Sequence, residues 1–302
     1  MAEGSTENKE IMLHCAGCGF KEDGDIKLKK CTACYLVQYC GVKCQREHWP
    51  KHKKECKKRA SELRDEILFK QPENTYPGDC PICCVPLSMD VQKSAMYSCC
   101  CNRICSGCSH ANAKREKEGR LGHKCPFCRH PVPKSGEEHR INYMKRVEAN
   151  DPVAMFQIGV YYSKKRDYKK AFEYWTKAAK LGSVNAHFNI SIMYDDGLGV
   201  EKDEKKRVYH LEEAAIGGHV DARYNLGDIE GKNGRYDRAK KHLIISAKQG
   251  DDGSLQKVKV LYEAGYVSKE EFATALQEHK AAVDATKSPQ REVAEAAKQR
   301  VR

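Results

Sequence analysis

Four cysteine-rich segments near the start of the chain decide the fold of its first part: CAGC at residues 15–18, CTAC at 31–34, CGVKC at 40–44 and HKKEC at 52–56. Each segment carries two zinc-type ligands separated by two or three residues, so that both side chains can reach one tetrahedral ion. Four chelating pairs predict two closed sites that leave no coordination position for a water. We therefore expect structural rather than catalytic metal, and a module that is unfolded without it.

The order of these ligands and their aromatic neighbours resembles the MYND zinc finger over residues 15–56. The segments YCGVKCQ at 39–45 and HWPKHKKEC at 48–56 carry the resemblance. In that family the first and third pairs bind one zinc, and the second and fourth pairs bind the other. The resemblance therefore implies one site from Cys15, Cys18, Cys40 and Cys44 and a second from Cys31, Cys34, His52 and Cys56.

MYND fingers bind short, often proline-containing peptides, so the resemblance implies peptide segments of partner proteins as ligands. Gln45 and Trp49 occupy positions that border the peptide groove in that family, and packing in a small core is the other interpretation of Trp49. His48 is expected at the surface, because the eight ligands are complete without it. The basic run at 51–59 indicates a solvated helix face, with an acidic partner or nuclear import as the alternative.

Residues 57–78 are typical of a linker with a short helix, since breakers such as Pro72 and Pro77 end the segment. A second set of cysteines follows: CPIC at 80–83, CCC at 99–101, CSGC at 105–108 and CPFC at 125–128. It again supplies enough thiolates for two closed sites. Five apolar residues between these ligands predict a small core: Ile82, Val85, Leu87, Ile104 and Phe127.

This second set resembles a RING finger over residues 79–132, because its opening CPIC and closing CPFCR match the ends of that family. The resemblance implies one zinc on Cys80, Cys83, Cys105 and Cys108. It implies a second zinc on two cysteines of the triplet together with Cys125 and Cys128. The usual RING histidine is replaced by Asn102, a poor zinc ligand, so the chain is similar to the all-cysteine variants.

Cys99 and Cys100 are the favoured pair of the triplet, with Cys101 as the substitute. His110 and His123 are alternatives that we expect to be ordinary surface histidines. Seven cysteines in the first module and eight in the second leave two of the 17 to spare, namely Cys84 and one of the triplet. Four Zn²⁺ ions per chain are therefore expected.

Many RING fingers are ubiquitin ligases, which position a ubiquitin-conjugating enzyme and need no catalytic residue of their own. Three residues match the docking surface of that family: Ile82 between the first two ligands, Pro126 between the last two, and Arg129 after the final ligand. A guanidinium has five donors in a fixed fork, which suits a bridge between two proteins. The alternative is that Arg129 is one more surface charge and that the module is a scaffold.

The half of the chain after residue 128 contains no cysteine and repeats itself. Three units begin with AMFQIGVY at 154, AHFNISIMY at 186 and ARYNLG at 222, and glycines 182, 218 and 250 end them. This period predicts pairs of helices stacked into a solenoid, with Trp175 in the core. The segment GLGVEKDEKK at 197–206 resembles the Sel-like repeat, a relative of the tetratricopeptide repeat, which implies protein binding.

The predicted fold class is therefore two small zinc-stabilised cross-brace modules of irregular α+β structure, followed by an all-α helix-pair solenoid at 151–283. Residues 253–283 are expected to form a degenerate or capping unit. The remaining segments are expected to be a disordered N-terminus at 1–14, a linker at 133–150 and a charged tail at 284–302.

Three functions are compatible with this pattern: a RING-type ubiquitin ligase that recruits substrate through its MYND finger and repeats, a non-enzymatic scaffold, and a nucleic-acid regulator. The net charge of +12 is spread along the chain, so a nucleic-acid partner is the weakest of the three. No apolar stretch is long enough to span a membrane, and no signal peptide is expected. Free thiolates need reducing surroundings, which favours the cytosol or the nucleus.

Overall fold

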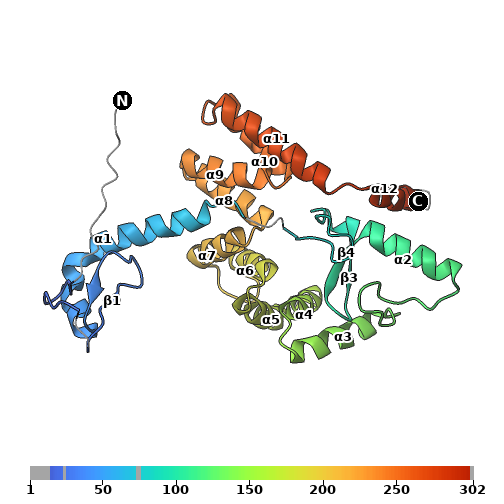
Figure 1. Ribbon diagram of the computed structural model, residues 1–302, viewed down its shortest axis with the longest axis horizontal. Helices are drawn as coiled ribbons and strands as arrows, with labels where there is room; N and C mark the ends of the chain where they lie inside the picture. The colour runs from blue at the N-terminus through green and yellow to red at the C-terminus, as the bar shows by residue number, and fades with distance from the viewer. Residues whose placement is uncertain (1–13, 23–24, 73–75, 300–302) are drawn as a thin grey trace. The chain divides into compact units, whose positions relative to one another are not determined.

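The computed structural model describes residues 14–22, 25–72 and 76–299, and it divides into two compact units, Met1–Lys70 and Gln71–Arg302. Each unit is described by itself below (Figure 1). The N-terminus at 1–14, expected to be disordered, lies outside the described residues except for His14.

The first unit is built from a short antiparallel strand pair, β1 (Lys29–Lys30) and β2 (Gln38–Tyr39), and one long helix, α1 (Val42–Leu68). Its core consists mainly of cysteine, with Val37 and Tyr39 buried beside the sulfurs. The helix continues through much of the segment that we expected to be a linker with a short helix. The reason is composition, because 51–68 is rich in Lys, Arg, Glu, Ala and Leu, which favour helices.

The second unit begins with a zinc-type module in which β3 (Ser94–Tyr97) pairs antiparallel with β4 (Asn102–Cys105). A 3₁₀ turn (Val91–Lys93) precedes the pair, and α2 (Ser106–Glu118) follows it directly. Leu87, Tyr97 and Ile104 are buried among the cysteines. The prediction for Ile82 and Phe127 was wrong, since these side chains are 43% and 48% exposed. Both lie inside chelating turns, where the side chains between the two ligands face outward.

Helix α3 (Gly136–Glu148) occupies most of the segment expected to be a linker at 133–150 and packs against the next helix. Ser135 caps it, because its hydroxyl accepts a hydrogen bond from the Glu138 amide at 3.2 Å. Two side chains of α3, His139 and Asn142, reach the buried hydroxyl of Ser98 at 3.0 and 3.4 Å. The helix therefore joins the zinc module to the repeats.

The repeats form a solenoid of helix pairs, as the sequence predicted (Figure 1). The last pair corresponds to the expected capping unit. The bounds of the eight helices are α4 (Pro152–Lys164), α5 (Tyr168–Lys180), α6 (Val184–Asp196), α7 (Glu204–Ile216), α8 (Val220–Lys232), α9 (Tyr236–Ala247), α10 (Asp252–Glu263) and α11 (Lys269–Ala285).

Polar caps and glycines set the limits of these helices. Side-chain oxygens of Asp151 and Asp203, for example, accept hydrogen bonds from backbone amides of the first turns of α4 and α7. Glycines 182, 218 and 250 follow the second helix of each repeat and have φ values of 84°, 90° and 94°. This left-handed conformation is one that glycine adopts without steric cost, as the sequence pattern predicted.

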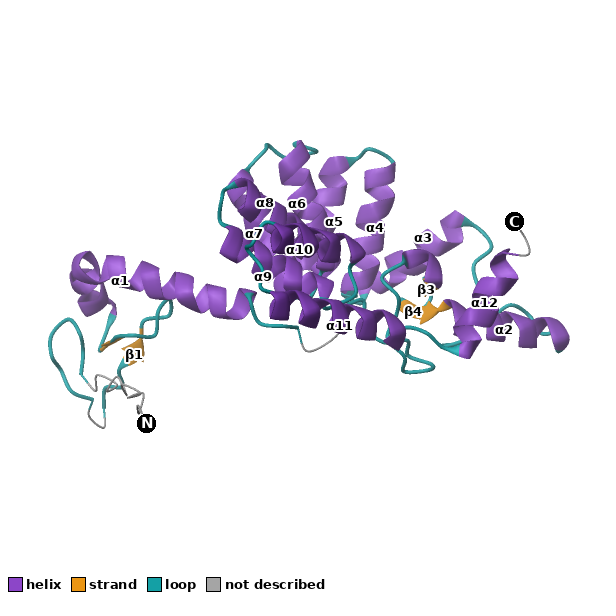
Figure 2. Cartoon of the chain, turned by 90° about the horizontal axis from the view of Figure 1, so that it is seen from above, coloured by secondary structure: helices purple, strands orange, loops and turns teal. Residues whose placement is uncertain are grey.

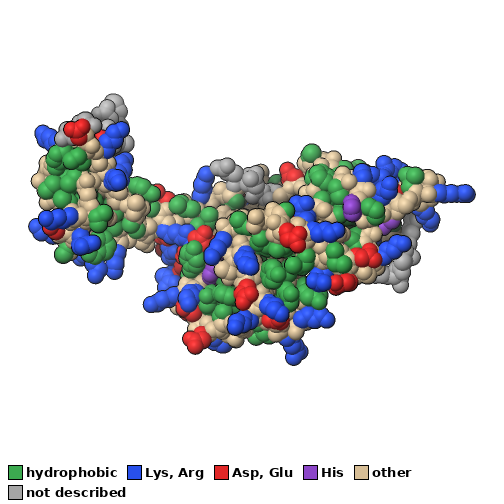
Figure 3. All heavy atoms as spheres, turned by 90° about the horizontal axis from the view of Figure 1, so that it is seen from below, with side chains coloured by type: hydrophobic (Ala, Val, Ile, Leu, Met, Phe, Trp, Pro, Cys, Tyr) green, Lys and Arg blue, Asp and Glu red, His purple; other side chains and the backbone are tan. Residues whose placement is uncertain are grey.

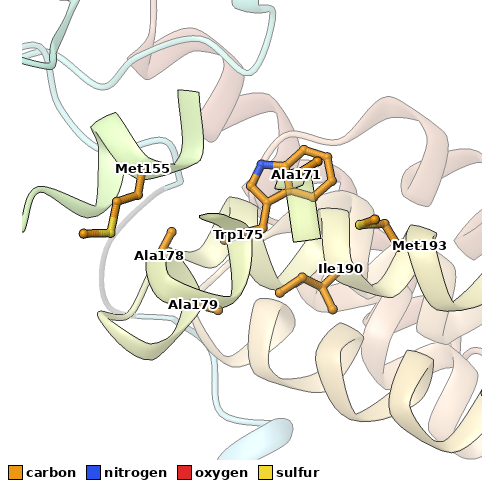
Figure 4. Packing of buried hydrophobic residues seen from close by; sticks show 8 residues of the cluster. Met155, Ala171, Trp175, Ala178, Ala179, Ile190 and Met193 are labelled. Carbon is orange, nitrogen blue, oxygen red and sulfur yellow. The ribbon is translucent and has the colours of Figure 1, made fainter. Parts of the chain in front are cut away.

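Trp175 lies in the core of the first repeat, 5% exposed, among Met155, Ile190 and small alanines (Figure 4). Its indole Nε1 donates a hydrogen bond to the carbonyl of Phe156 at 3.1 Å. The ring covers Gly159 so closely that a Cβ there would lie 2.3 Å from Nε1. The absence of a side chain at Gly159 is therefore what lets α5 approach α4.

Several histidines are buried in the repeats, and for His219 and His210 burial outweighs the nearby carboxylates of Asp221 and Glu213. His219 is 4% exposed, and its ring lies between the rings of Phe188 and Tyr76, with centroids at 4.3 and 4.9 Å. Burial lowers the pKa of His219 to about 4. Burial, followed by the neighbouring His187, lowers the pKa of His210 to about 4 as well. These side chains are therefore neutral at pH 7.

The C-terminal tail, for which the sequence indicated no partner, forms α12 (Pro289–Gln299), which packs against α2 of the zinc module. Figures 1 and 2 both show these helices side by side. Arg291 and Ala294, three residues apart on one face of α12, are buried. Chain segments almost two hundred residues apart thus form one body.

Charged side chains of both signs are mixed on the face shown in Figure 3, where Lys and Arg lie among Asp and Glu along the repeats. Charged side chains of the repeats also form ion pairs, such as Lys240 with Glu271 at 3.2 Å. Among the described residues, no helix combines the length and the apolar character that a membrane span requires.

Replacing Gly159 with alanine tests the close contact with Trp175. The added methyl group overpacks the core, so we expect the free energy of unfolding to fall by about 1–3 kcal/mol. The matched control is Gly231→Ala in α8, where a Cβ meets nothing closer than 4.0 Å. That variant should be neutral or slightly more stable in thermal and urea denaturation. Equal effects of the two substitutions would contradict the packing.

The buried histidines predict that stability falls as pH drops from about 6.5 towards 4. The unfolded chain binds protons in this window and the folded chain does not, so acid favours unfolding. For His219→Asn, we expect the loss of unfolding free energy between pH 7 and pH 5 to be about 2 kcal/mol smaller than in the unsubstituted chain. Asparagine also suits this N-cap position. An unchanged pH dependence, measured by urea denaturation, would show that His219 is not buried neutral.

Candidate metal centres and docking surface

The chelating turns share one backbone design. In four of them the amide four residues after the first cysteine donates back to its carbonyl, as Tyr35 does to Cys31 at 2.9 Å and Arg129 does to Cys125 at 2.9 Å. The donating residue has a positive φ in each case, 78° at Gly19, 56° at Tyr35, 53° at Cys84 and 62° at Arg129. The turn aims both cysteine side chains of a pair at one point.

The four clusters interleave along the chain. The structure brings together Cys15, Cys18, Cys40 and Cys44, and separately Cys31, Cys34, His52 and Cys56. In the second module it brings together Cys80, Cys83, Cys105 and Cys108, and separately Cys99, Cys100, Cys125 and Cys128. Within each cluster all ligand atoms lie within 4.8 Å of one another. These sets agree with the ones that the two family resemblances imply, and the two cysteines from the triplet are the favoured pair, Cys99 and Cys100.

The distances between ligand atoms fit zinc. A tetrahedral ion with Zn–S bonds of about 2.3 Å separates its sulfurs by about 3.8 Å. Observed sulfur pairs are Cys31–Cys56 at 3.7 Å, Cys83–Cys105 at 3.8 Å and Cys100–Cys125 at 3.8 Å. A disulfide needs about 2.05 Å, and all 17 cysteines are free. The donor set therefore fits four closed zinc sites, and the prediction of zinc is confirmed.

The electrostatics of the clusters also call for a cation. Burial opposes ionisation of Cys15, but backbone amides of Cys40, Cys18 and Gly17 donate to its sulfur and lower the pKa of Cys15 to about 6. Within the same cluster, hydrogen bonding with Cys40 and then with Cys18 raises the pKa of Cys44 to about 12. Sulfurs this close cannot all be thiolates unless a positive ion lies between them.

One supporting residue of the first module was missed by the sequence prediction. His48, expected at the surface, is half-buried; its Nδ1 and the Tyr39 hydroxyl are hydrogen bonded at 3.0 Å. Its ring stacks on the ring of His52 with centroids 5.7 Å apart. The stacked ring of His48 covers one face of the His52 ring and so restricts the orientations that the metal-binding imidazole can take. Their i, i+4 spacing on one helix was the available signal.

The cysteine triplet divides between two roles. Cys99 and Cys100 join the fourth cluster, whereas Cys101 ends the turn with a φ of 56° and turns its side chain away from the sulfurs. Burial, and then the carboxylate of Asp151, raises the pKa of Cys101 to about 12. Cys84 is exposed and belongs to no cluster.

The two histidines considered as alternative zinc ligands, His110 and His123, lie outside the four clusters. His123 contacts the buried carboxylate of Glu116 at 3.0 Å, and neither it nor His110 joins a cluster among the described residues. Asn102 begins β4 and pairs with Tyr97 in the sheet.

Ile82, Pro126 and Arg129 come together on the surface of the second module. They line one open hollow of about 470 Å³, with Ala111 and Arg115 of α2 and Gln290 of α12 beside them. The Arg129 guanidinium donates to Asn112 Oδ1 at 3.1 Å and lies 3.8 Å from Glu116 Oε1. Glu116 is buried beneath Arg129 and forms an ion pair with it, a role that the sequence did not indicate.

In the first module, Trp49 does not fill the core. Its side chain is 40% exposed, and its ring meets that of His52 edge-on at 6.5 Å. Gln45 lies one helical turn earlier on α1, and residues four apart share a helix face. The two residues together form a partly apolar surface beside the second zinc site.

Comparison with known families agrees with two of the three resemblances. The model of the MYND finger matches residues 15–56. The Sel1 repeat matches residues 152–183 and 184–219, and a tetratricopeptide repeat matches 220–244. No RING family model matches. The chain is thus a zinc-binding protein built from protein-interaction modules.

The curated relatives are similar over the finger alone. The N-lysine methyltransferase SMYD2 of Gallus gallus is 49% identical over 43 residues, which cover 14% of this chain and 9% of that protein. The histone-lysine N-methyltransferase ASHR1 of Arabidopsis thaliana is 51% identical over 50 residues, or 17% and 10% of the two chains. The matched region thus spans about a tenth of these relatives, whose activities are their own.

Two solved structures align with part of the chain. A Sel1 repeat protein from Oxalobacter formigenes aligns with a TM-score of 0.43 and 20% identity, covering 59% of this chain and 72% of that one. The protective antigen c5321 of Escherichia coli, which displays an SLR fold, aligns with a TM-score of 0.41 and 21% identity, covering 65% and 40%.

Substituting single cysteines tests the assignment of the triplet. We expect Cys100→Ser to reduce bound zinc from four ions to three per chain, because it breaks a closed site. Cys101→Ser is the matched control and should keep four ions, since its sulfur lies outside the cluster. Zinc counted by native mass spectrometry gives the answer. Loss of zinc from Cys101→Ser with retention in Cys100→Ser would reverse the assignment.

Proposed function

We propose that the protein is a zinc-dependent ubiquitin ligase and adaptor. The second module holds a ubiquitin-conjugating enzyme, and the MYND finger and helical repeats recruit the substrate. One observation carries the proposal: two interleaved four-cysteine clusters support a surface on which Ile82, Pro126 and Arg129 line the same hollow. This combination is the one that the RING resemblance implies.

The chemistry of such a ligase is positioning. Ile82 and Pro126 offer apolar contact to a loop of the conjugating enzyme, and Ile82 is 43% exposed although a residue of its kind is usually buried. Arg129 would donate to carbonyls of both the enzyme and its thioester-linked ubiquitin. Fixing the thioester in one reactive pose accelerates the attack of a substrate amine without any residue taking part covalently.

The surroundings of Arg129 support this role. Asn112 and the buried Glu116 fix the guanidinium at the module surface, yet the side chain remains 44% exposed. A charge held in place loses less conformational entropy on binding than a free arginine. Arg129 also has a positive φ, because it closes the chelating turn of Cys125 and Cys128. Zinc binding to that turn would therefore fix the backbone position from which the Arg129 side chain extends.

Substrate recruitment is assigned to the other modules. Trp49 presents an aromatic face and Gln45 an amide on one side of α1, which suits a proline-containing peptide. Stacked helix pairs of the Sel1 type offer an extended surface for a second contact. Two linked sites raise avidity without tighter individual binding. Thiolate sites of this number also favour the reducing cytosol or nucleus.

A non-enzymatic scaffold is the second candidate. The family comparison favours it, because protein-interaction modules match the finger and the repeats while no RING family model matches the second module. In a scaffold the two zinc modules would serve only as rigid supports for docking surfaces.

A ubiquitin-discharge assay distinguishes the two candidates. Purified protein is mixed with a panel of conjugating enzymes charged with ubiquitin, and loss of the thioester is followed over time. We expect discharge by the unsubstituted protein, and a fall of about tenfold or more in Ile82→Ala and Arg129→Ala, because each removes part of the positioning contact. Zinc is counted in each sample and should stay at four.

Lys114→Ala is the control, since Lys114 is exposed on α2 and lies outside the hollow. It should discharge at the unsubstituted rate. If no conjugating enzyme responds to fully zinc-loaded protein, or if Arg129→Ala has no effect on an active protein, the ligase proposal fails and the scaffold remains.

A further inference from the structure

The C-terminal helix α12 lies directly on the start of α2, where the third zinc cluster is built. Gly107 stands between the ligands Cys105 and Cys108, and a Cβ there would be 3.0 Å from Arg291 Cγ and from the Arg291 backbone nitrogen. Only glycine permits this approach. Ala294, three residues further along α12, is also buried. Figure 2 shows α12 beside α2.

One side chain of α12 enters the zinc module. Arg291 is 6% exposed and donates to the carbonyls of Pro86 at 2.5 Å and Val85 at 2.9 Å, which directly follow the first chelating turn. Its Nη2 lies 3.7 Å from Cys83 Sγ, within hydrogen-bonding range of sulfur. Its Nη1 also donates to the Thr286 carbonyl at 2.6 Å, close to the end of α11.

The charge of Arg291 complements the charge of the site. Four thiolates around one Zn²⁺ leave a net charge of −2, and burying that charge is costly unless a cation or donor compensates it. A guanidinium is always protonated and donates in a fixed fork, so it can bond both a sulfur and the carbonyls beside it. Outer contacts of this kind commonly change metal affinity 10- to 100-fold.

We propose that Arg291 is an outer-sphere partner of the zinc site formed by Cys80, Cys83, Cys105 and Cys108. Through this residue the C-terminal helix α12 would stabilise the bound metal. Arg291 is a positioning residue: it orients Cys83, neutralises part of the site's charge and slows zinc release. The proposal is independent of ligase activity, because it concerns only the retention of the metal.

Other contacts fix α12 without touching a ligand sulfur, and they provide the control. Lys298 Nζ donates to the Gln92 carbonyl at 2.8 Å, and Glu295 pairs with Lys93 at 3.2 Å. Loss of the Lys298 contact loosens the far end of the helix but leaves the charge at Cys83 in place.

Zinc transfer from the full-length protein to a chromogenic chelator tests the proposal. In Arg291→Met we expect one of the four zinc ions to leave about tenfold faster or more, while the other three keep their rates. Arg291→Lys retains the positive charge and should lie between Arg291→Met and the unsubstituted protein. Lys298→Met should release zinc at the unsubstituted rate. Helix content and thermal unfolding of the repeats are measured in parallel and should be unchanged.

Three results would overturn the proposal. Release of all zinc from Arg291→Met at the unsubstituted rate would show that the guanidinium does not support the site. Equal release from Lys298→Met and Arg291→Met would assign the effect to docking of the helix in general. Equal release from Arg291→Lys and Arg291→Met would exclude the charge as the cause.

Discussion

The bond between zinc and thiolate is the interaction on which both N-terminal modules depend. Their cores consist largely of cysteine, and sulfurs such as Cys99 and Cys128 approach to 3.4 Å, a distance at which thiolates repel one another strongly. A Zn²⁺ ion bound by the four ligand atoms of a cluster offsets this repulsion with its positive charge. The apolar residues that remain are too few to hold these loops in place, so metal binding and folding are one process.

The repeats depend on a different constraint, the close approach of neighbouring helices. In the second unit the repeats and the second zinc module are in direct contact. Ser98 bonds to α3, the Tyr76 hydroxyl bonds to Asn185 of α6, and Arg291 returns from the C-terminus to the third zinc cluster. These are polar contacts between segments distant in sequence. They make the second zinc module part of the solenoid's body, so a surface on that module has a fixed orientation relative to the repeats that would recruit a partner.

Much of this was readable from the sequence, because ligand spacing and glycine position are local properties. The chelating pairs, and with them the zinc stoichiometry, follow from residues within a few positions of one another, and the helix-pair repeats follow from a pattern that recurs along the sequence. The roles of Glu116, His48 and Arg291 could not be predicted, since each acts through a partner that only folding brings close. The sequence predicts a linker at 133–150, whereas the structure has α3 there, a helix with no fully buried residue. The exposure of Ile82 and Phe127 likewise depends on the turn geometry, which composition does not reveal.

Four closed zinc sites use fifteen of the seventeen cysteines. Native mass spectrometry of the folded chain, combined with alkylation by a thiol reagent, tests it most directly. The account predicts four zinc ions per chain and, while zinc is bound, modification at Cys84 and more slowly at Cys101 only, because the first is exposed and the second is buried. Fewer than four ions in a folded chain, or alkylation of any cluster cysteine with zinc in place, would contradict it.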